Sequence, residues 1–137
     1  MDLYAENILD HYRDPRNRGA GKGAGITGKE ENPSCGDALT LHLWIEGNVL
    51  RKIEWEGTGC AISQAAMSML SEEITGKSVP EILALKKDNV YAMLGVPVGP
   101  RRYKCALIGL HALKNTLLKY EGKEPQSWLT TVEIDDE

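Results

Sequence analysis

The strongest constraint on the fold lies in residues 38–45, where large aliphatic side chains recur at every second position and alternate with Thr40, His42 and Trp44. The apolar members of this alternation are Leu39, Leu41, Leu43 and Ile45. Alternation with a period of two is typical of a β-strand with one buried face. Glu46-Gly47-Asn48 then predicts a turn, and residues 49–56 predict a second strand with Ile53 and Trp55 on one face. The two segments therefore predict an antiparallel hairpin that buries one face.

Helical patterns flank the hairpin, and a further short strand is expected near Gly25–Lys29. A first helix is predicted over residues 2–13, ended by Asp14-Pro15, with a core face of Leu3, Ile8, Leu9 and Tyr12. Further helices are predicted over 61–74, 79–86 and 101–120. A short helical turn that Asp88 would cap is expected to run to Leu94. The apolar stripe of the last long helix is formed by Ala106, Leu110, Leu113, Leu117 and Tyr120. This order predicts an α+β fold, with a small antiparallel sheet of about three strands packed against several helices.

Length and charge narrow the class of protein. A chain of 137 residues predicts a single domain, with a helix and motif in residues 1–20 and an extended acidic tail in residues 122–137. Sixteen Lys and Arg against twenty Asp and Glu argue against broad electrostatic binding to nucleic acid or to an anionic membrane. We find neither a long apolar run nor the start of a secretory signal. A cytoplasmic protein is therefore expected.

The cysteines Cys35, Cys60 and Cys105 form a poor disulfide framework, because their number is odd and their spacing wide. No pair has CxxC spacing. They are either unrelated buried thiols or parts of one site, and each falls at the boundary of a predicted element, where side chains converge. Asp37 follows Cys35 by two residues, so three thiolates and one carboxylate would supply four ligands. Such a set suits tetrahedral Zn²⁺ or one side of an iron–sulfur cluster.

Positive charge at a helix start favours the thiolate form of cysteine. Cys60 and Cys105 both fall where helices are predicted to begin, and Arg101, Arg102 and Lys104 precede Cys105. Other interpretations stay open: Asp37 could cap a turn, and Arg102 and Lys104 could be solvated charges.

The remaining histidines and methionines are assigned to structural roles. His11, His42 and His111 are expected to be structural or surface residues, because none is close in sequence to a cysteine. Met67 and Met69 are expected in the core. No Ser-His-Asp or Cys-His catalytic pattern is present in the sequence.

Four short motifs, in order, resemble the iron–sulfur cluster assembly scaffolds of the NifU N-terminal type, which include the Isc-type and Suf-type U proteins. The motifs are the DHYRDPRNRG run at residues 10–19, NPSCGD at 32–37, GCAIS at 59–63 and KCA at 104–106. The resemblance covers the chain from Tyr4 to about Tyr120. It implies a SufE/NifU-like α+β fold in which the three cysteines converge at one exposed end.

The resemblance also implies a function. Such proteins accept sulfur from a cysteine desulfurase, assemble a transient [2Fe–2S] cluster and pass it to apo-proteins, and many bind Zn²⁺ at the same ligands when isolated. It implies Cys35, Asp37, Cys60 and Cys105 as ligands of iron or zinc, with one of the cysteines as persulfide acceptor. Arg102 and Lys104 would support the site. No nucleic-acid or membrane partner is implied.

Two positions depart from the Isc type. Lys104 stands where a histidine commonly precedes the third cysteine, so no histidine ligand is expected. Residues 96–102 read VPVGPRR where the Isc type carries the LPPVK stretch that a dedicated chaperone binds, which speaks against that partnership. The run at residues 102–106 is more like the Suf type, yet the 45-residue interval between Cys60 and Cys105 is shorter than is usual there.

Two functions from different classes follow. The first is a scaffold and carrier protein rather than an enzyme. The alternative is a zinc-dependent sulfurtransferase that relays persulfide sulfur without holding a cluster. A purely structural zinc domain is a third interpretation, and it predicts that the fold collapses when the metal is removed.

Overall fold

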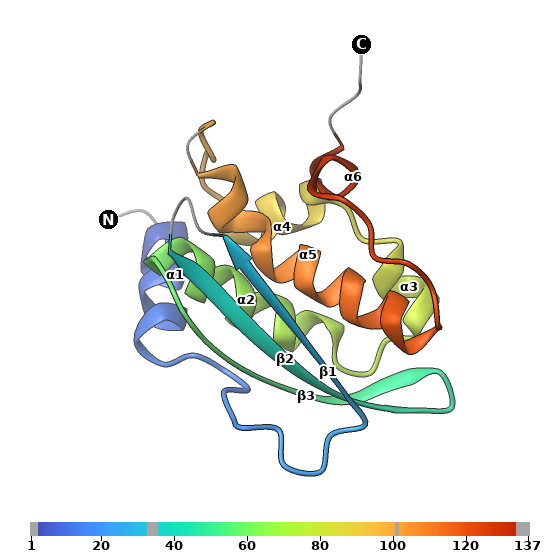
Figure 1. The fold of residues 1–137 in the computed structure, drawn as a ribbon. Coiled ribbons are helices and arrows are strands. Elements are labelled where there is room, and N and C mark those ends of the chain that lie inside the picture. Colours follow the sequence, from blue (N-terminus) through green and yellow to red (C-terminus); the bar gives the residue numbers. More distant parts are fainter. Residues whose placement is uncertain (1–2, 33–35, 101, 134–137) are drawn as a thin grey trace.

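The computed structural model describes residues 3–32, 36–100 and 102–133 (Figure 1). In chain order, the elements are α1 (Leu3–Arg13), β1 (Ile26–Asn32), β2 (Asp37–Glu46), β3 (Val49–Thr58), α2 (Ala61–Ile74), α3 (Val79–Leu83), α4 (Lys87–Leu94), α5 (Tyr103–Tyr120) and α6 (Trp128–Val132). The strands form one antiparallel sheet in the order β1-β2-β3. The predicted α+β class is confirmed.

The β2–β3 hairpin follows the alternation in the sequence. Leu41 lies opposite Trp55 and Leu43 lies opposite Ile53, and all four side chains are buried. Gly47 and Asn48 both have φ of +60°, which is the backbone twist that favours tight two-residue hairpin turns. The buried face of the sheet is therefore set by local pattern and turn chemistry.

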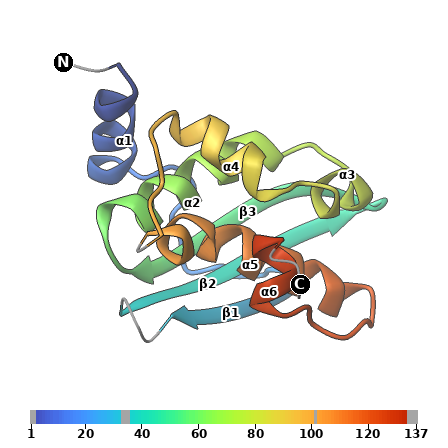
Figure 2. The same ribbon diagram turned by 90° about the horizontal axis from the view of Figure 1, so that it is seen from above.

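The helices cover this buried face, as Figure 2 shows. Two of them, α2 and α5, pack against the sheet and against each other. The largest fully buried side chains come from the sheet and the helices together: Trp55, Leu39, Leu41, Leu43, Leu50, Ile53, Met67, Leu70, Ile74, Ile82, Leu94 and Leu107. Met67 is fully buried and Met69 nearly so, which confirms the core role predicted for both.

Two glycines allow α5 to approach its neighbours closely. A methyl group at Gly28 of β1 would overlap the side chain of Thr116, and one at Gly109 of α5 would lie 2.9 Å from Met67 Sδ. Both contacts are closer than real Cβ atoms show, so neither position has room for a side chain without a shift of its neighbour. The position of α5 is therefore set by backbone-to-side-chain contact with both β1 and α2.

The segment after α1 joins the N-terminal helix to the sheet. Asn17 O accepts the N–H of Trp55 over 3.0 Å, and the indole Nε1–H of Trp55 donates to Arg16 O over 2.8 Å. His11 Nδ1 lies 2.7 Å from Ser68 Oγ of α2. The prediction that Tyr12 faces the core is wrong, because His11 occupies the inward face and the side chain of Tyr12 is 45% exposed.

Three further details differ from the sequence-based expectations. Helix α3 ends at Leu83 rather than at residue 86. Helix α4 is capped at Lys86, whose N–H donates to Asn89 Oδ1 over 2.8 Å, and not by Asp88. Tyr120, the last residue of α5, is 44% exposed, because the end of the helix extends past the sheet-facing core.

The C-terminal segment folds back onto α5. Trp128 stacks on His111 with ring centroids 4.2 Å apart, and Thr131 Oγ1 lies 2.6 Å from His111 Nδ1. The expectation of an extended tail over residues 122–137 is therefore wrong at α6, and residues 134–137 lie outside the described residues.

Along the described chain, no helix has both the length and the apolar character needed to cross a membrane.

Candidate metal centre

Three candidate ligands from three different elements meet at one end of the sheet. Asp37 is the first residue of β2, Cys60 is the residue directly before α2, and Cys105 is the third residue of α5. One ligand atom from each lies within 4.8 Å of the others. Cys35, the fourth residue of the expected set, lies outside the described residues. The structure thus brings together three of the four residues that the sequence singled out.

Gly59 lets β3 turn into α2 beside Asp37. Its φ is +154°, and a methyl group at this position would overlap Asp37 Oδ1 and approach Ser63 Oγ. Only glycine leaves room for the carboxylate here. The turn therefore places Cys60 at the start of a helix and against Asp37 at the same time.

The two oxygens of Asp37 have different surroundings. Oδ1 accepts the backbone N–H of Cys60 over 3.1 Å and lies 3.3 Å from Ser63 Oγ. Oδ2 is buried and has no hydrogen-bond partner among the residues that the structure describes. Buried carboxylate oxygens are normally paired with a donor or a cation. A metal ion bound by the two thiols would supply that missing partner, so the donor set fits a metal.

Both described cysteines lie at helix N-termini. Cys60 precedes the 14-residue α2, and Cys105 lies in the first turn of the 18-residue α5. Unpaired N–H groups and the helix dipole favour an anion at both positions. Thiolate sulfur with one carboxylate oxygen is a donor set that Zn²⁺ and iron both accept.

Exposure differs between the ligands. The expectation of an exposed cysteine end is wrong for Cys105, which is only 2% exposed, and Asp37 is also 2% exposed. Cys60 is partly exposed, and its Sγ lies 3.8 Å from Ser63 Oγ. Among the described ligands, Cys60 is the one that an incoming molecule can reach.

The expected supporting residues lie beside the third cysteine. Arg102 caps the start of α5 and is exposed, and Lys104 precedes Cys105 within the first turn. Arg101 lies outside the described residues.

The histidines are engaged elsewhere. His42 lies 3.0 Å from both Thr27 Oγ1 and Glu56 Oε2, and His11 and His111 have the partners given above. Burial lowers the pKa of His11, with the charge of Arg16 adding to the effect. Burial also lowers the pKa of His111, and Glu30 partly offsets this.

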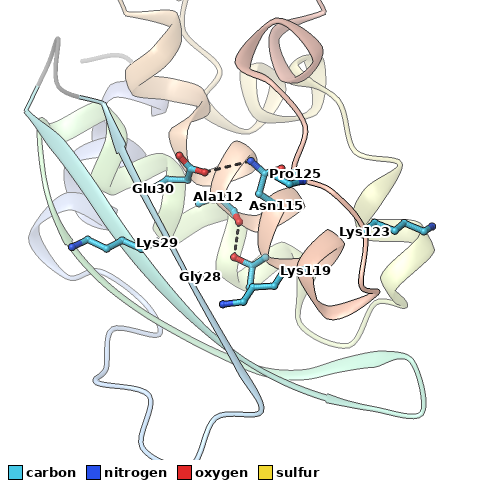
Figure 3. Close-up of a pocket in the computed structure, with 9 residues that line it drawn as sticks. Gly28, Lys29, Glu30, Ala112, Asn115, Lys119, Lys123 and Pro125 are labelled. Atoms are coloured by element: carbon cyan, nitrogen blue, oxygen red, sulfur yellow. Dashed lines mark hydrogen bonds between the residues drawn. The ribbon is translucent and has the colours of Figure 1, made fainter.

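A separate hollow of about 300 Å³ lies between β1 and α5 (Figure 3). Lys29, Lys119 and Lys123 line it, but their side chains point in different directions. Lys119 Nζ instead donates to Thr27 O over 3.1 Å. The three ammonium groups therefore do not converge on a common anion.

Two residues near the cluster were given no role from the sequence. Ser63 is fully buried and contacts Asp37, and Asn32 is 3% exposed and pairs with Asp37 across the sheet. Ser63 could have been found from the sequence, because it lies three residues after Cys60, in the first turn of the predicted helix. The asparagine could not, because its burial depends on strand pairing.

The fold and the cluster define a class: a small α+β domain with two cysteines and a carboxylate gathered at one end of its sheet. Comparison with known proteins narrows the class. The model of the NifU-like N-terminal domain matches residues 3–127, and the chain belongs to this family.

Individual relatives carry two kinds of name. The chain is 33% identical over 137 residues to the zinc-dependent sulfurtransferase SufU of Bacillus subtilis, covering 88% of this chain and 92% of that protein. It is 35% identical over 133 residues to the iron-sulfur cluster assembly scaffold protein IscU of Thermotoga maritima, covering 85% and 94%. Among solved structures, it resembles a putative iron-sulfur cluster assembly scaffold protein for the SUF system from Fervidobacterium islandicum, with a TM-score of 0.74, 28% identity and coverage of 82% and 94%.

Proposed function

We propose that this protein is an iron–sulfur cluster assembly scaffold. In this function it accepts sulfur from a cysteine desulfurase, assembles a [2Fe–2S] cluster on Cys35, Asp37, Cys60 and Cys105, and transfers the cluster to apo-proteins. The observation that carries the proposal is the unpartnered, buried Oδ2 of Asp37 in a cluster with the thiols of Cys60 and Cys105. The family membership and the names of the relatives support it.

Sulfur arrives by thiol–disulfide exchange. A thiolate of this chain attacks the outer sulfur of the desulfurase persulfide, the S–S bond breaks, and the desulfurase thiolate leaves. The persulfide is then carried on this chain. Of the two described cysteines, Cys60 fits the acceptor, because its side chain is partly exposed whereas that of Cys105 is buried.

Asp37 suits a protein that must release its cargo. A carboxylate is a harder ligand than a thiolate and a poorer partner for iron in a cluster. The hydrogen bond from Cys60 N–H and the nearby Ser63 hydroxyl hold Oδ1, which leaves Oδ2 as the ligand atom. The role of Asp37 is then to complete the ligand set while keeping the cluster transferable.

We propose the cysteine end of the molecule as the partner surface. The cysteine end meets the desulfurase, with Arg101, Arg102 and Lys104 as contacts. Recipient apo-proteins receive the cluster at the same end. Residues 96–102 do not match the sequence that an Isc-type chaperone binds, so no such partner is proposed. We assign the protein to the cytoplasm.

Anaerobic reconstitution with ferrous iron, cysteine, a desulfurase and a dithiol tests the proposal. The ferrous iron and the dithiol supply the electrons that reduce persulfide sulfur to the sulfide of the cluster. We expect the visible absorption of a [2Fe–2S] cluster and its transfer to an apo-ferredoxin. The Cys60→Ala and Cys105→Ala variants should form little cluster, and His42→Ala serves as the control, because its side chain belongs to the opposite face of the hairpin. Absence of a transferable cluster in the unmodified protein would overturn the scaffold function.

A zinc-dependent sulfurtransferase is the second candidate, and the SufU relative favours it. In that function, Zn²⁺ holds the thiols as thiolates, and release of one cysteine frees it to accept the persulfide sulfur. The same preparation distinguishes the two. Strong stimulation of the desulfurase by the zinc form, without cluster formation, would favour the sulfurtransferase.

A further inference from the structure

Asn32 lies directly opposite Asp37 in the β1–β2 ladder. In the same register, Glu30 of β1 pairs with the fully buried Leu39 of β2. Side chains two residues apart on a strand share a face, so Asn32 and Asp37 both point to the side that the helices cover. Directly opposed side chains on one face are neighbours, with Cβ atoms about 5 Å apart.

These two facing residues share an unusual property. Asn32 is 3% exposed, and its Nδ2 has no hydrogen-bond partner within the described parts of the chain. The same holds for Oδ2 of Asp37. A buried amide donor and a buried carboxylate acceptor thus lie on adjacent strands, unpaired with each other. Unpaired buried polar atoms are unfavourable, and where they persist they often mark a binding site.

We propose that Asn32 is a further positioning residue of the site, whose Nδ2–H donates a hydrogen bond to a sulfur anion held between the ligands. The inference rests on the proposed function, since it concerns the sulfur that this site carries. An amide N–H has no lone pair to offer a metal, so Nδ2 of Asn32 is not itself a ligand atom. Its partner is an acceptor, either a ligand thiolate or the sulfur carried as a persulfide or sulfide.

The charge at the site explains why a sulfur acceptor fits. The described site gathers a buried carboxylate with the buried thiol of Cys105 and the partly exposed thiol of Cys60, and the nearby donors Cys60 N–H and Ser63 Oγ are directed at Asp37 Oδ1. Hydrogen bonds to sulfur stabilise its negative charge and tune the metal centres that it joins. Asn32 supplies such a donor from β1, the strand that pairs with the start of β2.

The competing explanation is structural: the amide could brace the chain between Asn32 and Asp37. The two explanations predict opposite changes in the metal-free protein. If the amide waits for a sulfur anion, replacing it by an apolar group of similar shape removes an unpaired buried donor, and the apo-protein keeps or gains stability. If the amide braces the backbone, the same change lowers the stability.

The test compares Asn32→Leu, Asn32→Gln and the exposed control Asn7→Leu, all with Co²⁺ as the probe. Loss of the N–H···S bond should move the sulfur-to-cobalt charge-transfer band of Asn32→Leu to longer wavelength, since the sulfur lone pairs rise in energy. Asn32→Gln keeps a donor and should restore part of the shift, and Asn7→Leu should match the unmodified protein. The Tm of apo Asn32→Leu should equal or exceed that of the unmodified protein.

An unchanged charge-transfer band in folded Asn32→Leu overturns the inference, and so does a Tm lowered by several degrees in its apo form. If Asn32→Leu does not fold, the smaller Asn32→Ala variant is measured in the same way. Failure of the proposed function looks different, because the unmodified protein would then form no transferable [2Fe–2S] cluster on reconstitution, whatever the Co²⁺ spectra of the Asn32 variants show.

Discussion

The backbone N–H of Cys60 donates a hydrogen bond to Oδ1 of Asp37 over 3.1 Å, although the residues are 23 positions apart. This bond joins the start of β2 to the start of α2. With Ser63 beside the same oxygen, it holds Oδ1 in place, while Oδ2 has no hydrogen-bond partner among the described residues. The ligand geometry is therefore organised before a metal arrives.

Substitution of Gly59 should damage the metal centre without unfolding the protein. In Gly59→Ala, the added methyl group overlaps Asp37 Oδ1 and crowds Ser63 Oγ, so the carboxylate must move. We expect Zn²⁺ affinity to fall by about tenfold or more, which is typical when the support of a ligand is lost. Competition with a chromophoric chelator measures the affinity.

Gly23→Ala is the matched control for this experiment. Gly23 also has a positive φ, of +84°, but no atom lies within 4 Å of its added methyl group. This variant should lose about 1 kcal/mol of stability through backbone strain and keep its Zn²⁺ affinity. Equal losses of affinity in both variants would show that strain, rather than the displaced carboxylate, is responsible.

Replacing Asp37 by Ala should slow cluster release. The variant loses the hard ligand, and a more thiolate-like site holds iron and sulfide longer. We expect cluster transfer to an apo-ferredoxin to slow severalfold, followed by circular dichroism in the visible range. Asp37→Asn keeps an acceptor for the N–H of Cys60 and separates the effect of charge from that of support. A transfer rate equal to that of the unmodified protein would contradict this role.

The contact between Gly28 and Thr116 predicts a rescue. Gly28→Ala places a methyl group on the Thr116 side chain and should destabilise the protein by about 1–3 kcal/mol. Thr116→Ala removes the hydroxyl and the Cγ2 methyl group and leaves Cβ 2.9 Å from the added methyl group, so the double variant should recover part of the loss. Urea denaturation of the four proteins measures the coupling. Additive effects would show that the two residues do not press on each other.

Two buried histidines predict a loss of stability in mild acid. Burial lowers the pKa values of His11 and His111 below the ordinary value of 6.5, so the unfolded chain binds more protons than the folded chain as the pH falls past that value. The free energy of unfolding should be highest above about pH 6.5 and decrease below it. His111→Gln should show a weaker dependence between pH 7 and pH 5, measured by denaturation at each pH. If His111→Gln and the unmodified protein show the same pH dependence of the free energy of unfolding, His111 does not contribute to the loss of stability in acid.

Metal removal should leave the fold intact. The core of apolar residues from the sheet and helices is continuous and does not depend on the ligands for its packing. We expect the far-ultraviolet circular dichroism of the protein to be nearly unchanged after chelation and dialysis. Collapse of the helical signal would support the structural zinc domain instead.

The elements that could be predicted from the sequence are those whose pattern is local. Short stretches of sequence are enough to predict three elements: the alternation predicts β2, Gly47 predicts the turn, and the run of helix-forming residues after Cys60 predicts α2. The convergence of Asp37, Cys60 and Cys105 was also predictable, because all three lie at element boundaries.

The features that were missed depend on partners far away in the chain. His11 replaces Tyr12 on the inward face because Ser68, 57 residues later, binds its ring. Helix α6 forms where Trp128 can stack on His111. The burial of Asn32 depends on pairing with β2 and on cover by the helices, which no short window of sequence contains.

The close contacts of α5 with its neighbours determine where the third cysteine of the proposed metal centre lies. Gly109 lies four residues, or about one helical turn, after Cys105, and it fixes the helix against Met67 of α2. The position of the Cys105 thiol therefore depends on this packing contact in the interior. A larger or smaller side chain in place of Met67 would displace the thiol without altering any ligand. Metal retention in this protein is then a property that selection can adjust through the hydrophobic core.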